Sequence, residues 1–208
     1  MIIAIDGAST DLSLALAEPH ATLLAEDAWS SAQRQSAELL PHLLALLARV
    51  ERPLRDASLI AVGTGPGSFT GLRVAMALAK GLAVGLRIPI VGVPSLVAWL
   101  DADPYATGAV ARAGAREAYL LARGEAAPRI VDRDALAAVG RVVAPSELAI
   151  AFGLPDARRP RGAVSIARRA AERISGDAAG DDPRTLEPIY LRAPRGVAAE
   201  SGDLVRWL

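Results

Sequence analysis

The chain has 208 residues, enough for one large domain or two small ones, each with a buried core. Its 23 basic and 23 acidic residues balance, so no overall field draws it to nucleic acid or an anionic membrane, and the lack of cysteine excludes disulfides and thiolate metal sites. No basic segment precedes the first apolar run, and Pro41, Arg73 and Lys80 interrupt the longest runs before the roughly 18 residues of a membrane span. We therefore expect a cytoplasmic protein without a leader or a membrane segment.

The first half of the chain predicts a mixed sheet with helices. Three apolar runs separated by turn residues predict an antiparallel meander, and a helix, a buried strand, a second helix and another buried strand follow. The expected strands are 2–5, 12–17, 21–25, 58–63 and 89–93, and the expected helices are 36–50, with Ser36 as its N-cap, and 69–86, which follows Ser68. This order is typical of the ribonuclease-H-like half of actin-type folds.

The second half of the chain, beyond Trp99, carries weaker signals. The expected strands there are 106–111, 116–122 and 148–152, and the expected helix is 164–175. We predict an α/β protein with the actin-like ATPase fold, in which each of two lobes has a mixed β-sheet flanked by helices. Residues 1–104 would form the N-terminal lobe and residues 105–208 a smaller, degenerate C-terminal lobe.

The segment GTGPGSFTG, before the second helix, has the glycines of a phosphate-binding loop. A Walker loop needs glycine and lysine five and six residues after its first glycine, and neither stands at those positions. The dinucleotide pattern fails because it needs glycine at Thr70. A helix N-terminus retains weak affinity for anions, but we prefer to interpret the segment as a strand-to-helix turn. The expected turn residues are Gly63, Gly65, Gly67, Ser68 as N-cap, and Gly71, with Asp6 in the turn after the first strand.

Both helices of the first lobe carry apolar residues on more than one side. In helix 36–50 the two rows are Leu39, Leu43, Leu46 and Val50, and Leu40, Leu44 and Leu47. In helix 69–86 the rows are Leu72, Met76, Ala79 and Ala83, and Ala77, Gly81 and Gly85, while Arg73 and Lys80 are the only charges. Helices of this kind must be covered on most sides. The sequence leaves open whether the cover is the chain's own core or another chain.

One run of nine residues, Gly65-Pro-Gly-Ser-Phe-Thr-Gly-Leu-Arg73, is the most specific motif in the chain. It is accompanied by Gln35-Ser-Ala-Glu-Leu-Leu-Pro41, Ala79-Lys-Gly-Leu-Ala83, Pro89 to Ser95 (PIVGVPS) and Leu186-Glu-Pro-Ile-Tyr-Leu-Arg192. With these segments the chain resembles the bacterial TsaB family, also called YeaZ. The resemblance is firm to about residue 100 and patchy beyond it.

The resemblance implies a non-catalytic member of the actin-like ATPase superfamily, without cofactor or metal. Such a protein would form a heterodimer with a TsaD-like catalytic paralogue. Together with a TsaE-like ATPase, the pair would transfer a threonylcarbamoyl group to the adenosine beside the anticodon in tRNAs that read ANN codons, and the chain itself would contact tRNA only indirectly. The implied partner interface is Leu40, Leu43, Leu44, Leu47, Phe69, Leu72, Arg73, Met76 and Lys80.

Three segments depart from the family pattern, and they put any residual nucleotide or metal contact in doubt. They are Asp6-Gly-Ala-Ser9, Gln35-Ser36 and the stretch from Val110 to Tyr119. The main alternative is an ATPase or kinase of the same superfamily that uses Asp6, but the second lobe offers no Asp-x-Gly loop, and an acid at a strand end is often a turn former. A metallopeptidase is less favoured, because His20 and His42 form no His-x-x-x-His pair.

Direct RNA binding is the remaining alternative. Its candidates are second-lobe arginines without interleaved aromatic residues: Arg158, Arg159, Arg161, Arg168, Arg169 and Arg173. A solvated helix face is the preferred interpretation. For the isolated chain we expect a homodimer through the two apolar helices, which Met76→Glu or Leu47→Glu would disrupt. We also expect no tight binding of nucleotide or metal, and partner binding that survives Asp6→Ala.

Overall fold

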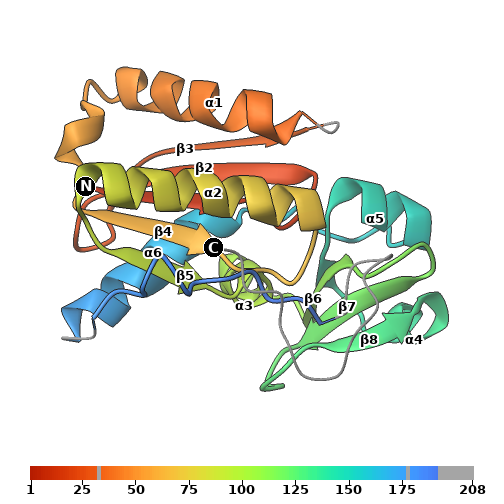
Figure 1. Cartoon of the computed structure of the whole chain (residues 1–208). Helices are drawn as coiled ribbons and strands as arrows, with labels where there is room; N and C mark the ends of the chain where they lie inside the picture. Colours follow the sequence, from red (N-terminus) through yellow and green to blue (C-terminus); the bar gives the residue numbers. More distant parts are fainter. Residues whose placement is uncertain (32–33, 177–178, 192–208) are drawn as a thin grey trace.

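The computed structural model describes residues 1–31, 34–176 and 179–191, which form two sheets with helices around them (Figure 1). The first sheet has five strands in the order β3-β2-β1-β4-β5. Their bounds are β1 Ile2–Asp6, β2 Asp11–Ala17, β3 Leu23–Ser30, β4 Leu59–Gly63 and β5 Ile90–Val93. β1, β2 and β3 form the predicted antiparallel meander, and β4 and β5 add in parallel to β1.

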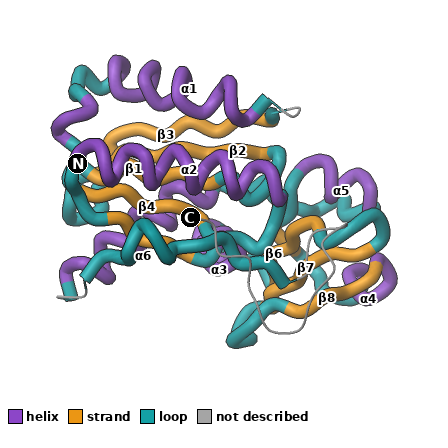
Figure 2. Tube along the Cα trace, in the orientation of Figure 1, coloured by secondary structure: helices purple, strands orange, loops and turns teal. Residues whose placement is uncertain are grey.

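The central strands are apolar on both faces because helices cover both faces. Every residue of β1, β2 and β4 is buried. Successive side chains of a strand point to opposite faces, so Ile3 and Ile5 pack toward one pair of helices while Ile2 and Ala4 pack toward another. The first pair is α1 (Gln35–Arg49) and α2 (Phe69–Leu86), and the second is α3 (Ser95–Ala102) and α6 (Gly162–Ser175). Figure 2 shows the resulting three layers.

Helix α2 begins where the sequence predicts. Ser68 is its N-cap, and the Ser68 hydroxyl accepts a hydrogen bond from the Gly71 amide at 3.2 Å. α2 is long and apolar enough to cross a membrane by composition alone, but here one side of it packs on the first sheet. Helix α1 starts one residue earlier than expected: Arg34 is the N-cap residue, without a side-chain cap bond, so Ser36 lies inside the helix.

The second sheet has four strands in the order β8-β7-β6-β9. Its strands are β6 Gly108–Arg112, β7 Glu117–Ala122, β8 Arg129–Asp132 and β9 Val142–Val143, and its helices are α4 Arg133–Ala137 and α5 Ser146–Phe152. The strand expected at 148–152 is therefore wrong, because these residues belong to α5. Leu148 and Phe152, four residues apart, are its buried side chains, which is the spacing of a helix packed on one side.

The end of the chain returns to the first lobe. Helix α6 packs on the face of the first sheet that carries Ile2 and Ala4. Residues 179–191, called the strap below, then run beside the edge strand β5, where the Asp181 amide donates to the Ile90 carbonyl at 2.7 Å. The expectation that residues 105–208 form the second lobe is thus corrected for α6 and the strap, which pack on the first lobe.

Candidate functional site

The glycine-rich turn between β4 and α2 is packed against the turn that follows β1. A Cβ atom on Gly67 would clash with the Ala8 carbonyl, and one on Gly71 with the Gly7 carbonyl. Gly65 has φ of +90°, a conformation that glycine adopts without strain. These glycines are present because two backbone segments approach closely, as expected for a structural turn.

Three amides of this turn already have acceptors inside the chain. The Ser68 amide donates to the Ala8 carbonyl at 2.7 Å, and the Gly65 amide donates to the Ser95 hydroxyl at 3.1 Å. The Gly71 amide is bound by the N-cap described above. A phosphate site needs such amides free and pointing at the ligand, and in this geometry these three are used to hold the turn.

Asp6 ends β1 and lies in the core, with 2% of its surface exposed. Its carboxylate accepts hydrogen bonds from Trp99 Nε1 at 2.6 Å, from the Ser95 hydroxyl at 3.0 Å and from the Ala8 amide at 3.2 Å. Burial raises the pKa of Asp6, while these three bonds act to lower it. Gly162, at the start of α6, packs so closely on the carboxylate that a Cβ atom there would clash. Asp6 therefore acts as a buried acceptor that joins β1 to α3, and its oxygens face side chains of the core.

The described residues contain no group of three or more His, Asp or Glu side chains that could hold a metal ion. His42 lies on the surface of α1, where its ring stacks on Trp29 at 3.8 Å between centroids and its Nδ1 lies 2.7 Å from a carboxylate oxygen of Asp27. His20 lies in the turn between β2 and β3. The two histidines are thus on different elements, as the sequence predicts.

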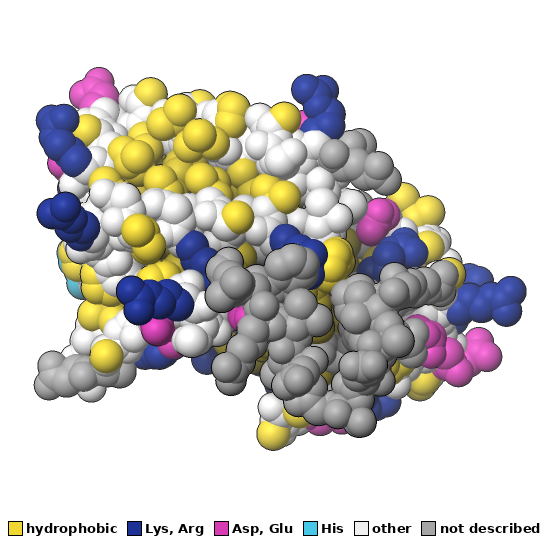
Figure 3. Space-filling view, viewed as in Figure 1, with side chains coloured by type: hydrophobic (Ala, Val, Ile, Leu, Met, Phe, Trp, Pro, Cys, Tyr) yellow, Lys and Arg dark blue, Asp and Glu magenta, His cyan; other side chains and the backbone are white. Residues whose placement is uncertain are grey.

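An exposed apolar surface lies over α1 and α2, which are side by side on the first sheet (Figure 3). Its large side chains are Leu40, Leu44 and Val84, which are 41%, 50% and 62% exposed. Phe69, 38% exposed, lies at the start of α2. Ala77, Gly81 and Gly85 are also exposed. We call these seven residues the α1–α2 face.

Four residues of the expected interface lie instead inside the chain. Leu43, Leu47, Leu72 and Met76 are between 0% and 4% exposed. The first two and Met76 belong to the core cluster beneath α1 and α2, and Leu72 belongs to the cluster between α3 and the second sheet. The expectation that these four contact a partner is corrected, because their side chains point into the core of the chain. Leu40, Leu44, Phe69, Arg73 and Lys80 remain at or beside the exposed face.

Two glycines of α2 lie in open space. A Cβ atom on Gly81 or on Gly85 would have no neighbouring atom within 4 Å. Glycine in a helix interior costs about 1 kcal/mol relative to alanine, and nothing within the chain requires it at these positions. The sequence placed both glycines in one row with Ala77, but only the structure shows that the row faces outward.

A second cluster joins the strap to the start of α2. The Arg73 guanidinium lies over the Phe69 ring, 3.8 Å from its centroid, and Arg73 Nε donates to the Tyr190 hydroxyl at 3.1 Å. The Phe69 and Tyr190 rings are 5.3 Å apart. Sequence reasoning did not connect Tyr190 with this site, because its contact with Arg73 spans 117 residues.

Most of the arginines that the sequence placed in the second lobe are paired with acids, and Arg168, Arg169 and Arg173 lie on α6, on the first lobe. Arg168 lies 3.3 Å from Asp101, Arg169 donates to the same carboxylate at 3.0 Å, and Arg173 donates to Asp181 at 3.0 Å. Arg159 and Arg161 pair with Asp11 and Glu26. These pairs weaken the case for a phosphate-binding patch, since each places an acid at the guanidinium.

Asp11 links the two lobes. Its carboxylate accepts hydrogen bonds from the Ser30 hydroxyl at 2.5 Å and from the Ser146 amide at 2.7 Å, and it pairs with Arg159 at 2.7 Å. Burial alone would raise the pKa of Asp11, but these bonds and the charge of Arg159 outweigh it and lower the pKa. The carboxylate is therefore ionised and holds the start of α5 against β2.

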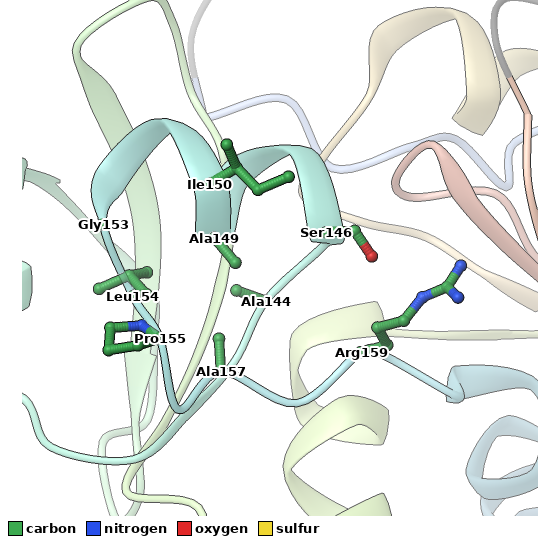
Figure 4. A pocket seen from close by; sticks show the side chains of 9 residues that line it. All are labelled: Ala144, Ser146, Ala149, Ile150, Gly153, Leu154, Pro155, Ala157 and Arg159. Atoms are coloured by element: carbon green, nitrogen blue, oxygen red, sulfur yellow. The ribbon is translucent and has the colours of Figure 1, made fainter.

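An open hollow of about 620 Å³ lies beside α5 (Figure 4). Its lining is mostly apolar: Ala144, Ser146, Ala149, Ile150, Gly153, Leu154, Pro155, Ala157 and Arg159. Arg159, its charged residue, lies on the Ser146 side and is bound to Asp11 and Ser30. The hollow thus brings together no acid, base or nucleophile that is available for chemistry.

Two α/β lobes, a buried carboxylate at the end of β1 and an exposed apolar helix pair define a protein of the actin-like ATPase fold. A family model for TsaD, tRNA N6-adenosine threonylcarbamoyltransferase, matches residues 29–173. An uncharacterized protein of Mycobacterium tuberculosis is 32% identical over 205 residues, which cover 93% of this chain and 92% of that protein. The tRNA threonylcarbamoyladenosine biosynthesis protein TsaB of Bacillus subtilis is 39% identical over 95 residues, which cover 46% of this chain and 41% of that protein.

A solved structure titled YeaZ from Pseudomonas aeruginosa shares the fold, with a TM-score of 0.71 at 23% identity over 91% of this chain and 99% of that one. The chain belongs to the TsaB (YeaZ) family of tRNA threonylcarbamoyladenosine biosynthesis proteins. The resemblance found in the sequence motifs is thereby confirmed.

Proposed function

We propose that this chain is the non-catalytic partner subunit of the complex that adds a threonylcarbamoyl group to the adenosine beside the anticodon in tRNAs that read ANN codons. It would bind a TsaD-like catalytic paralogue through the α1–α2 face and work with a TsaE-like ATPase in the cytoplasm. The observation that carries the proposal is the exposed apolar face itself, with Leu40, Leu44 and Val84 in solvent and open space above Gly81 and Gly85. An apolar patch over two adjacent helices is typical of a protein–protein interface.

The burial and hydrogen bonding of Asp6, the candidate catalytic acid of an ATPase or kinase, support a non-catalytic role. An ATPase or kinase needs a carboxylate that reaches a metal or a hydroxyl group of the substrate. Asp6 instead accepts three hydrogen bonds from its own chain, and α6 packs against it. Three amides of the glycine-rich turn, those of Gly65, Ser68 and Gly71, are bound as well. The carboxylate that would activate a nucleotide is thus occupied by the chain itself.

The likeness to the TsaD family model supports the choice of partner. The match covers residues 29–173, which include both helices of the α1–α2 face. A catalytic protein of the same fold would present a similar pair of helices, and two such pairs can pack as a four-helix contact. Without the paralogue, two copies of this chain would associate weakly through the same face.

Reconstitution with purified proteins tests the proposal. The chain, the TsaD-like paralogue and the TsaE-like ATPase of the same genome are combined with unmodified tRNA and the threonylcarbamoyl donor, and threonylcarbamoyladenosine is measured by mass spectrometry of nucleosides. We expect product only when the chain is present, and a large loss with Leu44→Glu. Full activity without the chain, or no complex with the paralogue by size exclusion, would refute the proposal.

The alternative of an ATPase or kinase that uses Asp6 is tested on the chain alone. Calorimetry with ATP and magnesium should show no tight binding, since Asp6 and three of the turn amides are engaged. A dissociation constant in the low micromolar range, together with ATP turnover that Asp6→Asn abolishes, would favour the alternative.

A further inference from the structure

The strap is fixed to the first lobe near both of its ends. The Asp181 carboxylate accepts hydrogen bonds from the Gly92 amide at 2.7 Å and from the Arg173 guanidinium at 3.0 Å. Toward the other end, the Ile189 amide donates to the Thr64 carbonyl, in the turn before α2, at 2.7 Å. The path of the strap beside β5 is therefore set by the chain itself.

Three successive residues of the strap carry large side chains that are partly in water. Ile189, Tyr190 and Leu191, called the strap end below, are 36%, 37% and 40% exposed. A single exposed apolar side chain is ordinary on a protein surface, whereas a run of three is unfavourable unless it serves a contact. Leu186, earlier in the strap, packs instead on the core cluster beneath α1 and α2. The strap thus contributes Leu186 to the core and leaves the strap end at the surface.

The strap end continues the α1–α2 face. Phe69 belongs to that face, and its ring centroid lies 5.3 Å from the centroid of the Tyr190 ring. The Arg73 guanidinium packs on the Phe69 ring and also donates to the Tyr190 hydroxyl. Tyr190 therefore has a fixed orientation in the isolated chain, so that little ordering is needed when a partner covers it.

The Tyr190 hydroxyl retains an unused hydrogen-bond donor. A phenol hydroxyl can accept and donate at once, and its oxygen accepts from Arg73. Within residues 1–31, 34–176 and 179–191, no acceptor for the Tyr190 hydroxyl proton is found. Covering this donor without an acceptor would cost free energy. A partner that buries Tyr190 must therefore offer an apolar pocket for the ring and an oxygen acceptor for the hydroxyl.

We infer that the strap end is a second part of the docking surface for the TsaD-like paralogue, with Tyr190 as its central side chain. The inference rests on the proposed function and adds to it a further contact region and the chemistry that the paralogue presents there. A stable interface uses about 20–30 residues of each partner, and the α1–α2 face has only seven. Further surface must take part, and the strap end is apolar surface that joins this face through Phe69.

Binding of the paralogue to variants of Tyr190 tests the inference. Tyr190→Ala removes the ring, and Tyr190→Phe removes only the hydroxyl. Tyr105→Ala is the matched control, because Tyr105 lies in the turn between α3 and β6, is 78% exposed and has Arg141 near its ring. Dissociation constants are measured by surface plasmon resonance, and thermal melts check that each isolated variant is folded.

We expect Tyr190→Ala to weaken binding about tenfold or more, Tyr190→Phe to weaken it about threefold, and Tyr105→Ala to leave it unchanged. Should Tyr190→Ala fail to fold, Tyr190→Phe and the measurement on the wild type described next decide the question.

Nitration of tyrosine by tetranitromethane, located by mass spectrometry, tests the contact itself. The chain has three tyrosines, of which Tyr119 is 6% exposed and Tyr105 serves as the internal reference. We expect the paralogue to slow nitration of Tyr190 severalfold and to leave that of Tyr105 unchanged. A Tyr190 that only braced α2 from within the chain would not be shielded by the partner.

The outcomes separate the inference from the proposed function. If Leu44→Glu abolishes binding but Tyr190→Ala binds like the wild type, or if the paralogue leaves nitration of Tyr190 unchanged, the inference is overturned and the proposed function stands. Equal affinity of Tyr190→Phe and the wild type would refute the acceptor. Shielding of Tyr190 at high concentrations of the chain alone, and not by the paralogue, would assign the strap end to a second copy and overturn the inference. Failure of the wild type to bind the paralogue would refute the proposed function itself.

Discussion

Replacing Gly81 and Gly85 by alanine should stabilise the isolated chain. Both positions lie within α2, and a Cβ atom at either meets nothing within 4 Å, so the new methyl groups cause no clash. Alanine is favoured over glycine by about 1 kcal/mol in a helix interior. Gly81 should give this full amount, and Gly85 less, because it lies in the last turn. The sum of about 1.5 kcal/mol corresponds to a rise of roughly 3–6 °C in the melting temperature of a chain of this size.

The assay is thermal unfolding followed by circular dichroism at several protein concentrations, since association through this face would make the melting temperature concentration-dependent. Gly71→Ala is the matched control, because it makes the same change on the same helix. There the Cβ atom would clash with the Gly7 carbonyl, which is backbone and cannot move aside. We expect this control to lose stability while the double variant gains it.

The same double variant should bind the paralogue more weakly, because glycine at an exposed helix position permits close approach of another backbone. If the monomeric double variant melted at a lower temperature than the monomeric wild type, the claim that alanine fits at both positions without a clash would be refuted. One that is more stable and binds equally well would show that these glycines are not in the contact.

Leu44→Glu should abolish association and leave the melting temperature of the monomer nearly unchanged. Leu43→Glu, one residue away, should unfold the chain, because it places a charge in the core. Equal effects of the two variants on the melting temperature would contradict the assignment of Leu44 to the exposed face and Leu43 to the core. Asp6→Ala should cost about 2–3 kcal/mol, because it leaves buried donors without an acceptor, while the folded fraction still binds the paralogue; urea denaturation and size exclusion measure both, and unchanged stability would show that the acceptor is dispensable. The pKa of Asp11 is lowered in the folded state, so its contribution to stability is present above its unfolded pKa, near 3.8, and is lost as pH falls through the folded pKa. Melting temperatures of wild type and Asp11→Asn should therefore converge below about pH 4, and a constant gap between the two curves would exclude this role.

Most of the first lobe could be predicted from sequence because its signals are local. Apolar runs bounded by turn formers mark β1 and β2, and the Ser68 cap marks the start of α2. The second lobe has shorter elements, such as β9 with two residues, whose local signals are weak. The helix α5 was taken for a strand because Leu-Ala-Ile-Ala-Phe reads as a buried apolar run, while its helical spacing shows only in which side chains are buried.

The candidate site was harder to predict than the fold. Leu43 and Leu44 are the same residue type in adjacent rows of α1, and local sequence does not say which row faces the sheet. The three-dimensional packing against β2 and β3 decides this. Likewise Asp11 and Arg159, which form an ion pair, are 148 positions apart in the sequence. No local sequence pattern could therefore predict their contact.

Helix α6 comes from the second half of the sequence but packs on the first sheet, so the first lobe contains segments from both halves of the chain. Residues 162–175 cover the face that carries Ile2 and Ala4, so a nascent chain that ends before them would expose that face to water. Cutting the chain near residue 104 would not give two halves that fold separately, because each half would lack part of the first lobe's core. Both lobes should therefore unfold in one cooperative transition when the protein is heated. A library of truncations would find residues 162–175 as essential to folding as the N-terminal strands, because α6 covers one face of the sheet that those strands form.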